Sequence, residues 1–232
     1  MIHETAMLRN IVFFSSLTDE ELSLVKGKVR IKKYKKNETI LHEEDSNEYM
    51  YTILSGKVKV IQTSEDGKDT ILAMHKAGDF FGEMSLIDGK TMPATVLALE
   101  ETVTAIISKS EFLHLITTHR KVLEKLLIIL SSRLRDAWHK IQLLNFNNAA
   151  DRLRMLFTIL SGEYGDKNGE GIILKIKLTH QDIANMAGIT RETVTRVIDK
   201  WQKDKEITIL KNKFIRLNVG FLERGLQLSS RK

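Results

Sequence analysis

The stretch LTHQDIANMAGITRETVTRVIDKWQKD, residues 178–204, decides the fold of the last third of the chain. Thr179 is placed to cap a first helix and Thr190 to cap a second, because threonine side chains accept hydrogen bonds from first-turn N–H groups. Gly188 lies between the two, where a residue that tolerates the left-handed conformation allows a tight turn. The pattern predicts a helix-turn-helix unit.

The second of these helices has an apolar face and a polar face. Arg191, Glu192 and Arg196 lie on the polar face, close to the start of the helix. Such side chains suit the DNA major groove, because arginine can bind guanine through two hydrogen bonds and glutamate can accept one from cytosine. We expect Thr193 and Thr195 to point outward as well. The positions expected to face the core are Val194, Val197, Ile198 and Trp201.

A β-hairpin follows the two helices. Residues 207–210 and 214–217 are typical strands, and Asn212 lies at the expected tip, so the pattern predicts a wing. Residues 149–232 contain 16 Lys and Arg against 10 Asp and Glu, whereas residues 1–148 are balanced, with 20 of each. A basic winged helix-turn-helix favours double-stranded DNA as the partner over a helical hairpin without a DNA role.

The first half of the chain has the pattern of short antiparallel strands. Residues 57–60 alternate lysine with valine, which is typical of a half-buried strand, and Asp66-Gly67 favours a hairpin turn. Many short strands separated by turns indicate a small barrel or jelly roll. The other predicted strands are residues 51–54, 70–74, 95–99 and 102–107.

Helices follow the barrel. Ser110 is placed to cap a short helix over residues 111–116, and a long helix is expected over residues 119–144. Apolar residues recur along the long helix at alternating steps of four and three. This period favours a two-stranded dimer seam over an ordinary core helix, because it is narrower than a globular face requires. The seam positions are Leu123, Leu127, Leu130, Leu134, Ala137, Ile141 and Leu144.

These patterns predict an α+β chain of three parts. Residues 1–118 form a β jelly-roll effector domain, residues 119–145 a dimerisation helix, and residues 146–232 a winged helix-turn-helix domain, with a polar loop at residues 162–171. There is no cysteine, which excludes disulfides, zinc-thiolate sites and cysteine-ligated iron–sulfur clusters. No run is apolar enough for a membrane span and no signal peptide is visible, so we expect a cytoplasmic protein without a membrane partner.

Three stretches resemble one family. YTILSGKVKV (residues 51–60), GDFFGEMSLIDG (residues 78–89) and ITRETVTRV (residues 189–197) are similar to the cyclic-AMP receptor protein/FNR (Crp/Fnr) family of bacterial transcription factors. The resemblance implies a cyclic-nucleotide-binding-like jelly roll and a homodimer on a palindromic DNA site, with half-sites about one helical turn apart. It also implies contact with RNA polymerase through residues 163–171. No nucleophile–base pair or phosphate-loop signature supports an enzyme.

The resemblance also implies roles for single residues at the DNA. By similarity, Arg191, Glu192 and Arg196 read bases. The residues expected to hold phosphates are Thr179, Gln181, Thr190 and Lys213.

The resemblance is weakest at the effector pocket. In family members that bind cyclic nucleotides, a Gly-Glu pair holds the ribose and an Arg-Ser pair before an alanine clamps the phosphate; a Thr-Ser pair on the long helix reaches the base. This chain keeps the first pair and replaces both others. The residues at these positions are Gly82, Glu83, Met84 and Ser85, then Met92 and Pro93 followed by Ala94, then Ala137 and Trp138.

The altered positions predict that cyclic AMP does not bind. A buried phosphodiester needs a charge-assisted partner; Met92 offers none, and Pro93 has no backbone N–H. Three possibilities remain for the effector: an apolar or aromatic molecule, haem, or no ligand at all, with Trp138 locking an active dimer. Residues 42–45, a histidine followed by three acidic residues, are interpreted as a solvated turn rather than a metal site. Candidate axial ligands for haem are His75, His139, Met74 and Met92.

Overall fold

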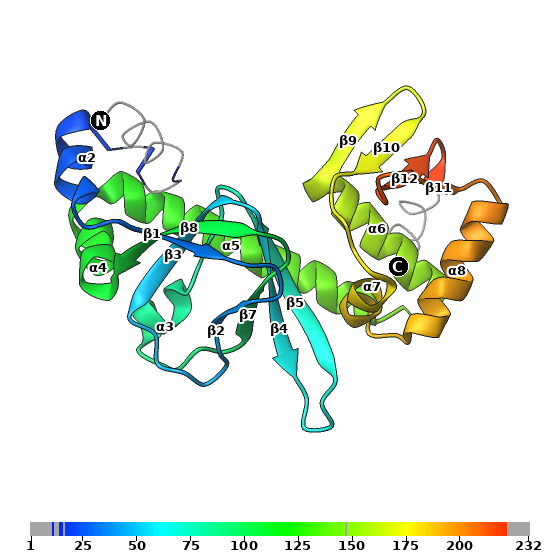
Figure 1. The fold of residues 1–232 in the computed structure, drawn as a ribbon, viewed down its shortest axis with the longest axis horizontal. Helices are drawn as coiled ribbons and strands as arrows, with labels where there is room; N and C mark the ends of the chain where they lie inside the picture. The colour runs from blue at the N-terminus through cyan, green and yellow to red at the C-terminus, as the bar shows by residue number, and fades with distance from the viewer. Residues whose placement is uncertain (1–10, 12–13, 16, 147, 222–232) are drawn as a thin grey trace. The chain divides into compact units, whose positions relative to one another are not determined.

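The computed structural model describes residues 11, 14–15, 17–146 and 148–221 (Figure 1). The chain forms two compact units, Met1–Leu134 and Arg135–Lys232. Helix α5 (Arg120–Leu144) begins in the first unit and ends in the second. Among the described residues, no helix has the length and apolar composition needed to cross a membrane.

The first unit contains two four-stranded sheets that form the expected jelly roll. Among the described residues, the strand pairings within them are antiparallel, which confirms the β prediction for this part of the chain. One sheet has the order β1 (Arg30–Tyr34), β8 (Thr102–Ser108), β3 (Tyr49–Ser55) and β6 (Phe80–Phe81). The other has the order β2 (Thr39–Leu41), β7 (Thr95–Ala98), β4 (Lys57–Thr63) and β5 (Asp69–Lys76).

Two apolar cores stabilise this unit. One includes Tyr51, Phe81 and Met92, and the rings of Tyr51 and Phe81 stack with their centroids 5.0 Å apart. The other joins Phe80 of β6 to Phe112 of α4 (Lys109–Thr118) and to residues of α2 (Asp19–Lys26) and α5. Burial of such side chains, worth about 1.5–3 kcal/mol each, is the main force that holds the unit together.

Some local predictions for this unit were wrong. Ser108 caps α4 by accepting from the Glu111 N–H, so the predicted cap at Ser110 lies two residues too late. Helix α2, capped by Thr18, lies in a region expected to be β. The predicted turn at residues 42–45 is not among these errors: a turn is present, and Glu44 there adopts a φ of 66°, a conformation that favours glycine.

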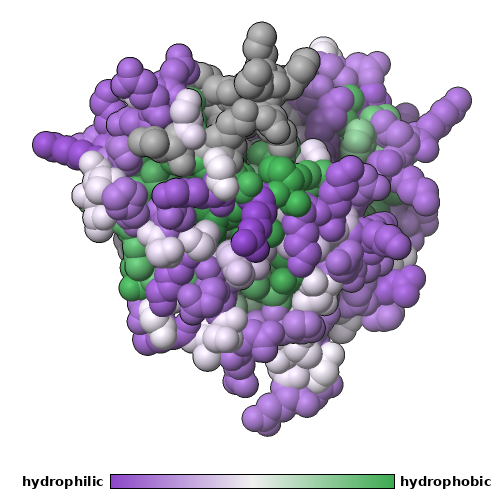
Figure 2. All heavy atoms as spheres, turned by 60° about the vertical axis from the view of Figure 1, so that its left-hand side comes forward, coloured by the Kyte–Doolittle hydropathy of each residue, from purple (hydrophilic) through white to green (hydrophobic). Residues whose placement is uncertain are grey.

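The long helix is confirmed, and its two apolar stripes differ in burial. Val122 and Leu126 belong to the core that also contains α2 and α4. The predicted seam lies on the exposed side, where Leu127 is 54 % and Ile141 60 % exposed. Among the described residues, Leu130 of the seam is partly buried against that core, and the other six seam positions are exposed. Hydrophobic surface between hydrophilic side chains is visible on the face drawn in Figure 2.

The second unit places helices against a four-stranded sheet. Its helices are α6 (Ala149–Tyr164), α7 (His180–Ala187) and α8 (Arg191–Lys203). Its sheet has the order β11 (Ile207–Ile209), β12 (Ile215–Asn218), β10 (Gly171–Leu174) and β9 (Gly165–Asn168). The predicted polar loop at residues 162–171 was wrong, because β9 and β10 pair there as a hairpin.

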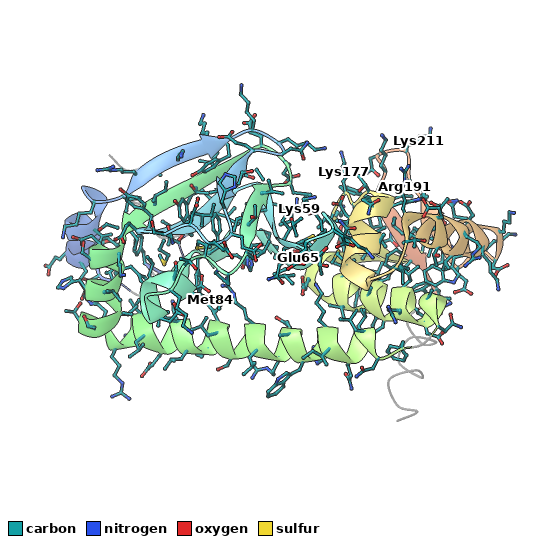
Figure 3. The ribbon with its side chains drawn as sticks, turned by 90° about the horizontal axis from the view of Figure 1, so that it is seen from below. Lys59, Glu65, Met84, Lys177, Arg191 and Lys211 are labelled. Atoms are coloured by element: carbon teal, nitrogen blue, oxygen red, sulfur yellow. The ribbon has the colours of Figure 1, made fainter. Side chains whose placement is uncertain are left out.

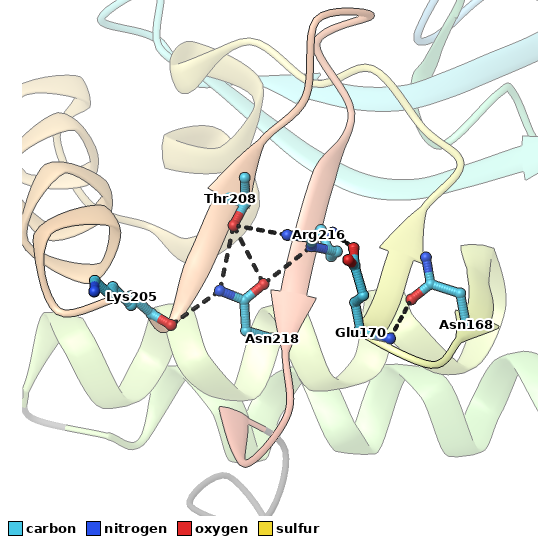
Figure 4. A network of polar contacts seen from close by, with 6 residues as sticks. All are labelled: Asn168, Glu170, Lys205, Thr208, Arg216 and Asn218. Atoms are coloured by element: carbon cyan, nitrogen blue, oxygen red, sulfur yellow. Dashed lines mark hydrogen bonds and ion pairs between the residues drawn. The ribbon is translucent and has the colours of Figure 1, made fainter.

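A polar network holds the wing against that hairpin (Figure 4). The Asn218 side chain donates to the Lys205 carbonyl at 2.9 Å and to the Thr208 hydroxyl at 3.2 Å. Arg216 donates to Asn218 and forms an ion pair with Glu170, in the turn between β9 and β10. These bonds hold the strands of the wing against each other and against the turn between β9 and β10.

Candidate DNA interface and effector site

Helix α7 begins at a reciprocal cap. The Thr179 hydroxyl accepts from the Asp182 N–H at 3.0 Å, and the Asp182 carboxylate accepts from the Thr179 N–H at 3.0 Å. This arrangement satisfies two N–H groups that the helix itself leaves without partners. The predicted cap at Thr179 is confirmed.

The turn between α7 and α8 depends on Gly188, which adopts a φ of 63°. A Cβ at this position would lie 3.3 Å from a methyl group of Leu144, at the end of α5. Thr190 then caps α8 by accepting from the Thr193 N–H. The predicted turn and second cap are both confirmed.

Arg152, on α6, holds this turn in place. Its guanidinium donates to the carbonyls of Ala187 and Gly188, both at 3.2 Å. It also donates to the carbonyl of Leu144 at 3.2 Å and to that of Phe146 at 2.7 Å. One side chain thus joins the end of α5, the linker that follows it, and the turn of the helix-turn-helix.

The inner face of α8 packs in an aromatic core. Trp201 meets Phe157 and Phe221 edge-on, with centroids 5.8 and 5.2 Å away. Arg154 lies over the Trp201 and Phe221 rings and pairs with Glu206 at 2.6 Å, with both charged side chains about nine-tenths buried. This core fixes the direction in which the opposite face of α8 points.

The opposite face of α8 exposes Arg191, Glu192 and Arg196, as expected. All three line one surface hollow that follows the helix. Thr195 is less available than expected, because its hydroxyl bonds the Arg191 carbonyl at 3.0 Å and lies 2.8 Å from Nδ1 of His180. The same hollow is also lined by Asp199, Lys200, Lys203 and Asp204.

The residues expected to hold phosphate lie at the two helix starts and on the wing. Thr179, Gln181, Thr190 and Lys213 are all exposed. The Thr179 hydroxyl donates to the Asp182 carboxylate at 2.6 Å, so its proton is already used. An anion at these helix starts would therefore be bound mainly by backbone N–H groups, because those of the first turn point out of a helix.

Lysines add positive charge near the wing. Lys177 and Lys211 lie on the same side of the second unit as Arg191 (Figure 3). The ammonium groups of Lys175 and Lys177 lie 5.9 and 5.7 Å from the centre of the Phe214 ring, next to Lys213. The sequence patterns did not single out Lys175, Lys177 or Lys211.

In the first unit, Glu83 is the buried acidic group of the candidate effector site. It starts α3 (Glu83–Asp88) after Gly82, whose φ is 87°. Its carboxylate pairs with the Arg133 guanidinium at 2.7 Å, and Arg133 also donates to the Phe80 carbonyl and lies over the Phe80 ring. Burial raises the pKa of the Glu83 carboxyl, and the nearby Arg133 opposes that rise only in part.

Ser85 and Met92 meet in the same region. The buried Ser85 hydroxyl lies 3.4 Å from Sδ of Met92, and the Asn47 amide donates to the Gly82 carbonyl at 2.9 Å and to the Ser85 hydroxyl at 3.3 Å. Met92 is 5 % exposed and belongs to the barrel core. Gly82, Glu83, Ser85 and Met92 are thus brought together, and Asn47 and Arg133 are partners that the sequence did not reveal.

The remaining candidates at this site are scattered. Ala94 is buried, whereas Met84 and Pro93 are exposed. Ala137 and Trp138 are exposed residues of α5 in the second unit, with Trp138 60 % exposed.

Burial and the neighbouring Arg133 lower the pKa of His75 to about 3, so its imidazole is neutral at physiological pH.

Comparison with known proteins assigns the family. The family model for the cyclic nucleotide-binding domain matches residues 31–119, and the model for the Crp-like helix-turn-helix domain matches residues 150–224. A cyclic AMP receptor protein of Thermus thermophilus is 31 % identical over 185 residues, which cover 80 % of this chain and 82 % of the relative. This chain belongs to the Crp/Fnr family. It is a transcription regulator with a helix-turn-helix DNA-binding domain.

Two further comparisons extend the likeness. The cAMP-activated global transcriptional regulator CRP of Pasteurella multocida is 32 % identical over 170 residues, covering 72 % of this chain and 80 % of the relative. The structure of FixK2 from Bradyrhizobium japonicum shares the fold, with a TM-score of 0.75 and 22 % identity over 86 % of this chain and 96 % of that one. Crp/Fnr proteins are regulators rather than enzymes.

Proposed function

We propose that this Crp/Fnr protein is a homodimer that binds a palindromic DNA site, reads bases through α8 and works without cyclic AMP. The observation that carries the DNA part is the exposed face of α8. Its two arginines and one glutamate stand on a helix whose caps, turn and aromatic core are complete. Its neighbours at the helix starts and on the wing supply positive charge and N–H groups for phosphates.

The exposed seam of α5 supports the dimer. Leu127, Leu134 and Ile141 are each more than half exposed and recur with the heptad period. A soluble chain gains about 1.5–3 kcal/mol for each such side chain that it fully buries, so a second copy of the same helix is the expected cover.

A single charge on the seam tests the dimer. Leu134→Glu places a carboxylate where two copies would meet, and we expect sedimentation to give a monomer at concentrations where the unmodified chain is a dimer. Ser132→Glu adds the same charge at an exposed position off the seam and serves as the control. Dimers that persist in Leu134→Glu would rule out this seam.

The roles on the DNA predict two different defects. Arg191→Ala removes a base contact and should cost about 1–3 kcal/mol of sequence preference. Lys213→Ala removes a phosphate contact and should weaken all sequences alike, with a shallower dependence on salt. The measurement is DNA affinity on a preferred site and on unrelated duplex at several salt concentrations. Equal loss of preference in both variants would contradict the assigned roles.

The candidate effector site supports independence from cyclic AMP. The Ser85 hydroxyl lies against the Met92 sulfur, and Glu83 already has a cationic partner in Arg133. A phosphodiester brought to Met92 would lose hydration without gaining a charged partner there. Isothermal titration should give no heat of binding with cyclic AMP at millimolar concentration, and micromolar affinity would overturn this part of the proposal.

The exposure of Trp138 favours a regulator that needs no ligand. The Trp138 indole is 60 % exposed on α5, so its burial against a second copy of the chain would be favourable. That burial would stabilise the active dimer. Haem is the alternative, with the neutral imidazole of His75 as a chemically suitable ligand. Purified protein without a Soret band, and with the same DNA affinity after dialysis, is the expected result.

A further inference from the structure

The first residue of α7, His180, joins the two helices of the helix-turn-helix through its side chain. Its Nδ1 lies 2.8 Å from the Thr195 hydroxyl on α8. His180 is partly exposed and stands between Thr179 and Gln181, two of the residues expected to hold phosphate. The contacts with DNA described so far do not involve this imidazole.

The contact with Thr195 fixes which ring nitrogen carries the proton. A threonine hydroxyl has one proton, and that of Thr195 donates to the Arg191 carbonyl at 3.0 Å. The hydroxyl therefore accepts from the ring, and Nδ1 of His180 is the N–H donor. In the neutral imidazole the nitrogen without a proton is then Nε2, so a second proton changes Nε2 and leaves the contact with Thr195 as it is.

The Nε2 atom is open to a new partner. Among the described residues, His180 forms no hydrogen bond besides the one to Thr195 and no ion pair. The nearby Asp182 carboxylate already accepts from the N–H and the hydroxyl of Thr179. A DNA phosphate at the start of α7 would therefore meet an imidazole whose second nitrogen is unused.

The charges around this end of α7 do not favour a second proton in the free protein. Arg152 of α6 donates at the other end of the helix, to the Ala187 and Gly188 carbonyls. First-turn N–H groups give a helix start a partial positive charge, which opposes a cation there. The charged side chains on the neighbouring segments are Lys177 before the helix, and Arg191, Glu192, Arg196 and Asp199 on α8.

We propose that His180 takes up a proton when the helix-turn-helix binds DNA, and that its Nε2–H then donates to a phosphate at the start of α7. The inference rests on the DNA interface proposed above. An anion next to an imidazole favours the charged form, and imidazole is the side chain that changes charge between about pH 5 and pH 8. Because the complex holds more protons than its free components, its affinity should rise as the pH falls. A purely structural link between α7 and α8 would give no such dependence, since the contact with Thr195 is the same in both charge states.

Fluorescence anisotropy of the full chain on a labelled palindromic duplex, at pH 8 and pH 5.5 and one ionic strength, tests this proposal. We expect the affinity to rise by about three- to fivefold for each half-site, and by about tenfold or more for a duplex that holds two copies, because an exposed ion pair contributes no more than this. His180→Gln cannot gain charge and should change much less. His180→Arg should bind at pH 8 as tightly as the unmodified chain does at pH 5.5. His114→Gln removes an exposed histidine of α4 and should keep the full dependence.

Two further measurements follow the proton itself. Calorimetric titration with DNA in two buffers of different ionisation enthalpy should show a proton uptake that His180→Gln lacks. Nitrogen NMR of the histidine rings should show the Nδ1–H form of His180 in the free protein at pH 8, and circular dichroism verifies that each variant is folded.

The outcomes separate this proposal from the DNA interface on which it rests. Equal pH dependence in the unmodified chain and in His180→Gln, affinity that falls with the pH, or an Nε2–H form in the free protein would overturn the role of His180 and leave DNA binding intact. Failure of the unmodified chain to bind any duplex would contradict the DNA interface, and this proposal with it.

Discussion

Replacement of Arg152 tests whether one side chain fixes the DNA-binding turn. In the structure its guanidinium donates to four carbonyls, those of Leu144, Phe146, Ala187 and Gly188, at 2.7–3.2 Å. Hydrogen bonds from a charged donor contribute about 1.5–3 kcal/mol each. Those of Arg152 share donors and are partly exposed, so they do not add. We therefore expect Arg152→Ala to lower the free energy of unfolding of the second unit by about 2–4 kcal/mol.

We expect that lysine cannot take over the stabilising role of Arg152. Its single ammonium group reaches fewer of the separated carbonyls than a planar guanidinium does, so Arg152→Lys should recover less than half of the loss. Urea unfolding followed by tryptophan fluorescence measures the stability, because Trp201 lies buried in the core of this unit. The DNA affinity of the folded variant should fall together with its stability, because the turn at Gly188 sets the orientation of α8.

The control for Arg152 is Arg135→Ala, which removes an exposed arginine of α5 in the same unit. It should change stability by less than about 0.5 kcal/mol, as surface substitutions usually do. An Arg152→Ala protein as stable as this control, with unchanged DNA affinity, would show that the guanidinium does not hold the three segments together.

Three other predictions concern single features of the chain. Gly188→Ala should destabilise the second unit by about 1–2 kcal/mol in urea unfolding, because the residue has a φ of 63° and its Cβ would crowd Leu144. His75 has a folded-state pKa of about 3 against an ordinary value of 6.5, so the stability it contributes is present above pH 6.5 and is lost as the pH falls toward 3. The free energy of unfolding should be up to about 2 kcal/mol lower at pH 5 than at pH 7.5, and His75→Gln should lack this loss. An equal change of stability with pH in both proteins would contradict the lowered pKa of His75. Met92→Arg/Pro93→Ser should bind cyclic AMP in isothermal titration and gain stability with it, about 2.7 kcal/mol at a concentration one hundred times the Kd; no binding would mean that more than this pair blocks the site.

The helix-turn-helix was predictable because its signals are local. Thr179, Gly188 and Thr190 each act on backbone within four residues, so their spacing already specifies the caps and the turn. Strand β9 was missed for the opposite reason: all four of its residues are exposed and none alternates with a buried one, so its pattern is that of a loop.

The candidate effector site was only half predictable. The sequence indicated Glu83 and Met92 because they stand in a recognisable stretch. Their partners Arg133 and Asn47 come from other parts of the chain, and no local spacing marks them. The pKa shift of His75 likewise depends on burial and on Arg133, both of which exist only after folding.

Affinity for DNA with and without cyclic AMP tests whether this protein recognises a palindromic site independently of cyclic AMP. The unmodified chain is titrated by fluorescence anisotropy onto a preferred palindromic duplex and onto unrelated duplex, at several salt concentrations. We expect a clear preference for the palindrome, a steep loss of affinity with salt, and the same affinities with and without cyclic AMP. Binding that requires cyclic AMP, or that shows no preference between the duplexes, would contradict it.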